Sequence, residues 1–230
     1  MKLQKLGGFA SFALVGLFIA LGVLLARISL LFGLTSPVPP STDLLDPAKM
    51  MAAYLASPVT FHLFDLSFIL WGIMPILIAL ALQERTQANA PNLMRLAFTA
   101  ASISFALFLT FAIADTIGAV ALAASTDISS YRAFLVIVSG ISGAGDNTCG
   151  WAFLFMGWAA LKTRALSRIL SYLMMAYGII AIFQSIFQIN MPLAVVMEYL
   201  PFIVSLLWLG VAFFRKQEPS PAKALAAARG

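Results

Sequence analysis

Ionisable side chains interrupt the apolar segments of this 230-residue chain, and Asp146 is the most informative of them. It lies in the segment Ser139-Gly-Ile-Ser-Gly-Ala-Gly-Asp-Asn-Thr-Cys-Gly150, inside a hydrophobic run over residues 131–161. If that run crosses a bilayer, Asp146 lies near the midplane, 14 residues from Arg132 and 16 from Lys162. A charge there costs about 2.5–3.5 kcal/mol on insertion scales, so the carboxylate is expected to face a partner or water.

Other polar residues are placed in the outer half of the same membrane. His62 and Asp65 share one face of their helix because they are three residues apart. Asp115 is predicted near the outer boundary of the hydrocarbon. We therefore predict a polar pocket that opens outward, with Asp146 at its floor and Arg27 as its only permanent cation. The residues of this predicted ligand or ion pocket are Arg27, His62, Asp65, Asp115, Asp146, Asn147 and Glu198.

The predicted pocket has an unbalanced charge. One cation cannot neutralise four carboxyl groups, so some acids must be protonated or must meet water or a bound cation. A simpler alternative remains open at this point. Asp65, Asp115 and Arg27 could lie among lipid headgroups or form a buried ion pair that orders the helices, since long arginine side chains reach the interface.

Small residues surround Asp146 and have two interpretations. Gly140, Gly143, Gly145 and Gly150 would let another helix approach closely, as small-xxx-small patterns do. They could instead mark an unwound segment whose carbonyl groups bind an ion. We favour helix packing as their role.

The composition of the chain excludes a soluble domain. Hydrophobic residues make up 62% and charged residues 10%, with a mean hydropathy of +0.98, whereas soluble domains average about 45–50% apolar and about 25% charged. Lipid can cover that much apolar surface, so we predict an all-α, polytopic transmembrane helical bundle with the lipid bilayer as its first partner. The net charge of +5 is explained by topology and does not indicate a nucleic-acid partner.

Six apolar segments are each long enough to cross a bilayer, which takes about 20 residues. Five prolines between residues 34 and 60 predict a long external loop after the first segment. Residues 1–214 thus form the predicted transmembrane domain, and 215–230 a flexible cytoplasmic tail. The predicted spans cover about 6–32, 61–82, 96–123, 133–161, 165–189 and 193–214.

The basic residues predict the orientation of the chain. Eleven of the 14 Lys and Arg residues fall on one side of the predicted membrane, Lys49 and Arg132 fall on the other, and Arg27 lies inside the first span. The excess of positive charge marks the cytoplasmic side, so both termini are predicted in the cytoplasm and the chain in the bacterial inner membrane. The long apolar stretch after the basic start favours an uncleaved first span over a signal peptide.

Catalysis and cofactor binding find little support in the sequence. Gly140-Ile-Ser-Gly143 matches the Gly-x-Ser-Gly of rhomboid proteases, but the only histidine, His62, precedes it, and a serine nucleophile needs a base on a later helix. One Cys and one His cannot form a Cys/His metal site. No nucleotide-binding glycine motif is present. We predict no catalytic residues, metal or cofactor.

Several short segments, taken in order, resemble a family of bacterial six-helix membrane proteins known as a domain of unknown function. The resemblance rests on Ala56-Ser57-Pro58, Asp65-Leu66, Ala79-Leu-Ala-Leu82, Phe153-Leu-Phe-Met-Gly157, Leu166-Ser-Arg168 and Gly178. It covers most of the chain and implies six helices with a long first external loop. The family pattern has Leu-Pro-Arg where this chain has Leu-Ser-Arg. The resemblance implies no activity and adds weight only to Asp65 and Arg168.

These observations predict a membrane protein that binds or transports a proton, a cation or a small amphiphile through its outward pocket. The alternative is a non-catalytic accessory or assembly subunit, in which the glycine-rich fourth span contacts another membrane subunit or a second copy of the chain. A membrane enzyme acting on lipid ranks third.

Overall fold

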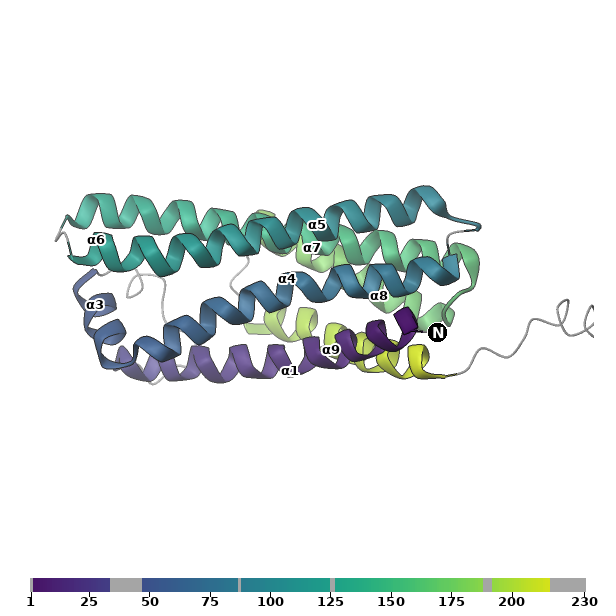
Figure 1. Cartoon of the computed structure of the whole chain (residues 1–230), viewed down its shortest axis with the longest axis horizontal. Coiled ribbons are helices and arrows are strands. Elements are labelled where there is room, and N and C mark those ends of the chain that lie inside the picture. The colour runs from purple at the N-terminus through teal and green to yellow at the C-terminus, as the bar shows by residue number, and fades with distance from the viewer. Residues whose placement is uncertain (1, 34–46, 87, 125–126, 188–191, 216–230) are drawn as a thin grey trace, which may run out of the picture.

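The computed structural model describes residues 2–33, 47–86, 88–124, 127–187 and 192–215, and every regular element within these ranges is a helix (Figure 1). The all-helical prediction is therefore confirmed. The elements are α1 (Lys2–Leu31), α3 (Pro47–Ala56), α4 (Pro58–Thr86), α5 (Pro91–Ala114), the π-helix η1 (Asp115–Ala119), α6 (Val120–Ala124), α7 (Ile128–Thr163), α8 (Arg168–Phe187) and α9 (Pro192–Phe214).

Four helical segments are long and apolar enough to cross a membrane, namely Leu3–Leu31, Pro58–Thr86, Pro91–Gly118 and Arg168–Ile186. The 36-residue α7 is longer than any of them, but its glycines and the polar residues around Asp146 lower its hydropathy. In α9 the part whose side chains the structure describes, Leu200–Phe214, is apolar and shorter than these four segments. The structure thus has the character of a membrane protein, and four of the six predicted spans meet the criteria of length and composition.

Proline begins several helices of this fold instead of breaking them. α3, α4, α5 and α9 all start at a proline, where the missing N–H is not needed and the fixed φ suits the first turn. The loop predicted over 34–60 is therefore wrong in its second part, because α3 occupies 47–56. The sequence that follows Pro47 is rich in Ala and Met, which favour helix. Residues 34–46 lie outside the described part of the chain.

The hairpin between α7 and α8 closes tightly at Arg164. Arg164 has φ 55° and ψ 29°, a left-handed conformation that is the common way to end a helix. Its N–H donates to the carbonyl groups of Ala160 and Leu161. Ser167 then begins the next helix, since its side-chain oxygen accepts from the N–H of Leu170 at 3.3 Å.

Asp127 caps the N-terminus of α7. Its Oδ1 accepts from the N–H groups of Ser129 and Ser130, and its Oδ2 accepts from the Ser130 hydroxyl at 2.6 Å. The hydrogen bonds from the hydroxyl groups of Ser130 and Ser129, assisted by those from the backbone, lower the pKa of Asp127 to about 2. All these donors favour the ionised form, so the cap is expected to weaken when Asp127 is protonated.

We expect this cap to give the stability of the protein a small acid dependence. The lowered pKa makes the ionised cap stabilising above the unfolded value near pH 4, and this contribution is lost as the pH falls through about 2. Asp127→Ala should lower the midpoint of thermal unfolding at neutral pH. Asp127→Asn keeps a capping oxygen without the charge and should differ less. A wild-type advantage over Asp127→Ala that persists undiminished below pH 2 would contradict this account.

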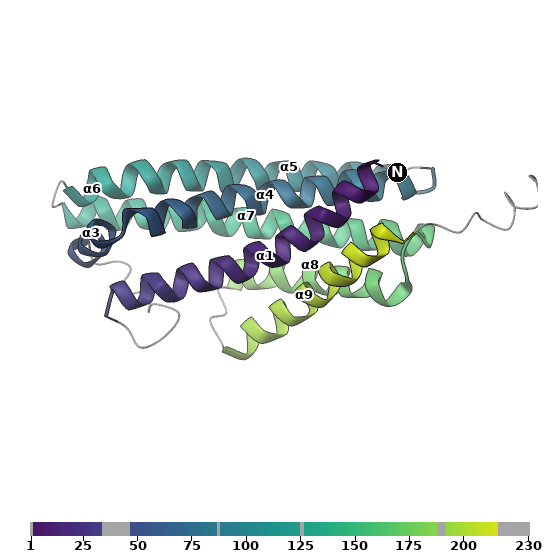
Figure 2. The same cartoon turned by 60° about the horizontal axis from the view of Figure 1, so that its bottom comes forward.

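The six long helices form a closed ring in which each packs on the next along the chain. The order around the ring is α1, α4, α5, α7, α8 and α9, and α9 returns to α1 (Figures 1 and 2). The middle of the ring is filled by aromatic side chains from five of these helices. Their ring centroids lie 4.1 to 6.4 Å apart, and the members are Phe18, Trp71, Phe153, Tyr177 and Phe202.

The two ends of the bundle differ. One end, marked N in Figure 1, gathers the start of α1, the turn from α4 to α5, the hairpin from α7 to α8 and the end of α9. Basic residues lie at or near these helix ends, and they include Lys5, Arg85, Arg95, Lys162, Arg164, Arg168 and Arg215. At the other end the short helix α3 lies across the bundle and contacts α1, α4, α6 and α7.

Candidate functional site

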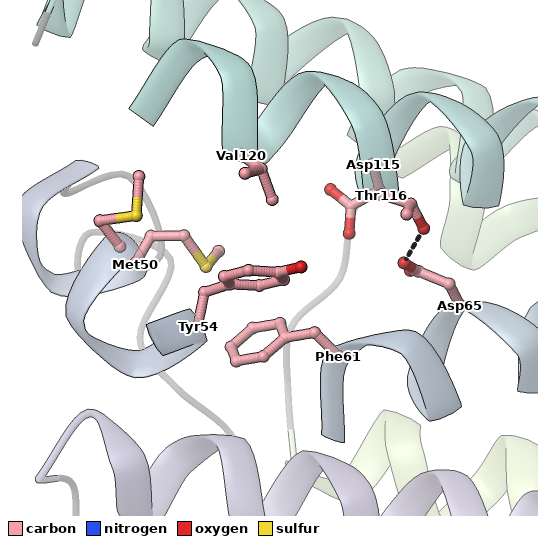
Figure 3. A pocket seen from close by; sticks show the side chains of 8 residues that line it. Met50, Tyr54, Phe61, Asp65, Asp115, Thr116 and Val120 are labelled. Carbon is pink, nitrogen blue, oxygen red and sulfur yellow. Dashed lines mark hydrogen bonds between the residues drawn. The ribbon is translucent and has the colours of Figure 1, made fainter. Parts of the chain in front are cut away.

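A small cavity lies at the α3 end of the bundle, between α3, α4, η1 and α6 (Figure 3). Its volume of about 20 Å³ is enough for roughly one water molecule. Apolar side chains form most of its wall, and four polar side chains reach into it. The lining residues are Met50, Met51, Tyr54, Phe61, Asp65, Asp115, Thr116 and Val120.

Asp65 is the buried acid of this cavity, with only 5% of its surface exposed. Its Oδ2 accepts a hydrogen bond of 2.5 Å from the hydroxyl of Thr116, drawn as a dashed line in Figure 3. Its Oδ1 is buried and has no hydrogen-bond partner among the described residues. Leaving a buried oxygen unsatisfied costs about 1–3 kcal/mol, and more when it is charged. The site therefore calls for a proton, a water molecule or a cation at Oδ1.

The π-helix η1 delivers Asp115 and Thr116 to the same cavity. A π-turn carries one more residue than an α-turn and often occurs at functional sites. Asp115 opens this turn while its own N–H still donates to the carbonyl groups of Phe111 and Ala112. Figure 3 shows the side chains of Asp115, Thr116 and Val120 entering the cavity from this one segment. The local change of helix geometry thus places a carboxyl group and a hydroxyl group side by side.

The two carboxyl groups lie at the same depth in the bundle and influence one another. Asp65 is 20 residues from Arg85, and Asp115 is 20 residues from Arg95, so each lies about 30 Å along its helix from the basic end. Both carboxyl groups line the same small cavity, and no Lys or Arg is among the described residues that line it. Two like charges in an apolar site need a shared proton or a bound cation.

His62 is joined to this cavity through Tyr54 of α3. The Tyr54 hydroxyl lies 3.1 Å from Nε2 of His62, and the two rings meet edge to face with centroids 5.8 Å apart. His62 itself is exposed and does not line the cavity. The contact fixes α3 over the start of α4, so that the tyrosine closes the cavity next to Phe61.

The other residues of the predicted pocket lie elsewhere. Arg27 is exposed on α1, and Asp146 is exposed on α7; neither is among the described lining residues. Asn147 faces α8, where its Nδ2 donates to the Ser185 hydroxyl at 2.8 Å. The side chain of Glu198 lies outside the described part of the chain. Of the four predicted acids, the cavity therefore brings together two.

The predicted packing glycines fall into two groups. A Cβ at Gly145 would lie 2.9 Å from the ring of Phe108, and one at Gly150 would lie 2.9 Å from the carbonyl oxygen of Gly178 on α8. Both of these positions are close helix contacts. Gly140 and Gly143 have nothing within 4 Å of such a Cβ and face open space. Gly178 was not among the predicted packing residues. It meets Gly150 across two different helices, so no spacing within one helix could reveal the contact.

Three groups of the cavity were not predicted as site residues. Tyr54 and the methionines of α3 lie in a segment predicted as loop, and Thr116 resembles an ordinary residue of an apolar span. The only sequence signal was the polar Asp115-Thr116 pair near the end of an apolar run. Among the described residues no group of three or more His, Cys, Asp or Glu side chains could hold a metal ion.

No family model, curated protein or solved structure matches this chain. The fold and the cavity therefore define the class on their own. Over the residues that the structure describes, it is an all-helical protein with four helices long and apolar enough to cross a membrane and two carboxyl groups lining one cavity. The resemblance to the bacterial six-helix family stays a prediction.

Proposed function

We propose that this chain is a six-span protein of the bacterial inner membrane with both termini in the cytoplasm. The 36 residues of α7 extend about 54 Å, well beyond the hydrocarbon core of about 30 Å. α9 closes the ring between α1 and α8, and its 23 residues are enough for a span. The gathering of basic helix ends at one end of the bundle supports a cytoplasmic position for that end.

In this orientation the Asp65–Asp115 cavity lies at the outer, periplasmic side, and it binds a proton or a single small cation for transfer across the outer boundary. The observation that carries this proposal is the buried Oδ1 of Asp65, which has no partner among the described residues, beside a second carboxyl group. A cavity of about 20 Å³ admits one small ion or water and excludes an amphiphile in this conformation. A divalent cation such as Ca²⁺ takes six or more oxygen ligands. The cavity offers two carboxyl groups, so a monovalent cation suits it better.

The test is cation and proton binding by the purified full-length protein. Na⁺ and K⁺ binding would be measured by calorimetry, and the protonated carboxyl band would be followed by infrared difference spectroscopy. Asp65→Asn and Asp115→Asn are each expected to weaken cation binding by about 10–100-fold, or to remove the carboxyl band, because each deletes a charged partner worth about 1.5–3 kcal/mol.

Asp146→Asn is the matched control, because Asp146 is an exposed acid on a helix that does not line the cavity. It should leave both signals unchanged. Folded Asp65→Asn and Asp115→Asn proteins with wild-type binding and a wild-type carboxyl band would refute the proposal. A loss caused only by Asp146→Asn would move the site to α7.

A further inference from the structure

A second, larger cavity lies at the basic end of the bundle, where α4 ends, α8 begins and α9 ends. Its volume is about 260 Å³, and it is open on one side. It is lined by Arg85, Ala165, Leu166, Ser167, Leu170, Trp208, Val211, Ala212 and Arg215. None of the proposed cation-site residues contributes to it, so the two cavities are separate.

Both charged side chains of this cavity are arginines. Arg85 is held in place by three contacts, since its Nη2 donates to Oε1 of Gln4 at 3.0 Å and to the carbonyl oxygen of Ala212 at 3.2 Å, while its Cζ lies 5.1 Å from the ring centroid of Phe213. Its Nε is buried and finds no acceptor among the described residues. A guanidinium that is fixed in this way and lines the cavity is a ready partner for a phosphate or carboxylate oxygen.

The start of α8, which also lines the cavity, favours an anion as well. Ser167 caps α8 through its Oγ, and its carbonyl oxygen accepts from the N–H of Ser171 at 3.0 Å. The first N–H groups of the helix that follows point out of its N-terminus, where the helix dipole is positive. No acidic residue is among the described residues that line the cavity. The cavity thus combines two arginines with a helix N-terminus, and Glu84, which interacts electrostatically with Arg85, does not line it.

Two apolar residues that line the cavity are also exposed at the surface of the bundle. Trp208 is 38% exposed and Val211 is 43% exposed, so an aromatic ring and an aliphatic side chain of the lining are accessible from outside. Tryptophan at this depth is typical of the boundary between headgroups and acyl chains. A ligand with an anionic head and an apolar tail matches this lining better than a fully polar anion.

We propose that this cavity binds a phosphate-bearing anion, and that its natural source is the headgroup of an anionic phospholipid in the cytoplasmic leaflet. Arg85 and Arg215 hold the phosphate, and Trp208 and Val211 contact the start of the acyl chains. Basic pockets between transmembrane helices on the cytoplasmic side are known to take such headgroups. The inference is independent of the cation site, although it shares the proposed membrane orientation.

The test uses the native tryptophan as its probe. Full-length protein in a nonionic detergent would be titrated with phosphatidylglycerol or phosphatidylcholine whose acyl chains carry bromine, which quenches tryptophan fluorescence on contact. Comparison with Trp208→Phe isolates the signal of Trp208. We expect phosphatidylglycerol to quench Trp208 at a much lower mole fraction than phosphatidylcholine, and Arg215→Gln to weaken this response about fivefold.

Arg95→Gln is the control, since Arg95 is an exposed arginine at the same end that does not line the cavity. Arg85→Gln tests the second arginine, and Arg215→Gln keeps the test valid if the loss of the Arg85 contacts prevents folding. Displacement of the lipid by inorganic phosphate alone would support the anion site and identify free phosphate as its source. Equal quenching by both lipids, or equal losses in Arg95→Gln and Arg215→Gln, would overturn the proposal.

Discussion

Gly178→Val is expected to prevent the chain from forming a stable bundle. An added Cβ at Gly178 would lie 2.5 Å from the carbonyl oxygen of Gly150 and 2.7 Å from the backbone nitrogen of Leu154. Backbone atoms cannot rotate away as a side chain does, so α7 and α8 must separate along their contact. Inserting extra methylene groups into a well-packed core typically costs about 1–3 kcal/mol. Valine adds more than one carbon atom at this position. The measurement is the yield of monodisperse protein and its thermal unfolding midpoint in detergent.

Gly143→Ala is the matched comparison for this change. Gly143 lies on the same α7, but nothing lies within 4 Å of its added Cβ, and alanine is the better helix former by about 0.5–1 kcal/mol. Its unfolding midpoint should equal or exceed that of the wild type. If Gly178→Val folds with an unchanged thermal unfolding midpoint, α7 and α8 do not pack as closely as described.

Much of this fold could be predicted because the bilayer imposes a length on each helix. Apolar runs of about 20 residues can only be helices or barrel strands in a membrane, and the described elements are all helical. The helix α3 was missed because the prolines around it were interpreted as loop residues, although Pro47 and Pro58 each occupy the first turn of a helix. The presence of a proline alone does not show whether a helix ends or begins there.

The sequence could predict only how deep in the membrane the site residues lie. Counting residues from the basic end places Asp65 and Asp115 at one level, and the cavity contains both. Counting cannot show which way a side chain faces, because lipid and helix core are equally apolar and leave little amphipathic signal. Asp146 was therefore assigned to the pocket floor, whereas its side chain is exposed on α7. The π-turn at Asp115 leaves no periodic pattern that a sequence could reveal.

Phe202→Ala is expected to destabilise the bundle by about 3–5 kcal/mol, the usual range for removing a fully buried phenylalanine. Phe202 is 0% exposed, and its ring stacks on Tyr177 with centroids 4.1 Å apart. The same ring contacts Trp71 at 5.4 Å, Phe153 at 5.7 Å and Phe18 at 6.4 Å. One side chain therefore joins α9 to four other helices. Without it a cavity would remain in the centre of the ring, and α9 would lose its principal anchor. Unfolding by denaturant or heat in detergent would measure the loss.

Phe98→Ala is the control, because Phe98 is 37% exposed on α5 and should cost far less. Phe202→Ala also separates the two proposed sites. α9 supplies Trp208 and the Ala212 carbonyl to the arginine cavity, whereas the Asp65 cavity is lined by α3, α4, η1 and α6. Protein that remains folded should therefore lose the selective quenching of Trp208 by phosphatidylglycerol before it loses cation binding. Simultaneous loss of both at every temperature would mean that the ring responds as one rigid unit, with its ends coupled through the aromatic centre.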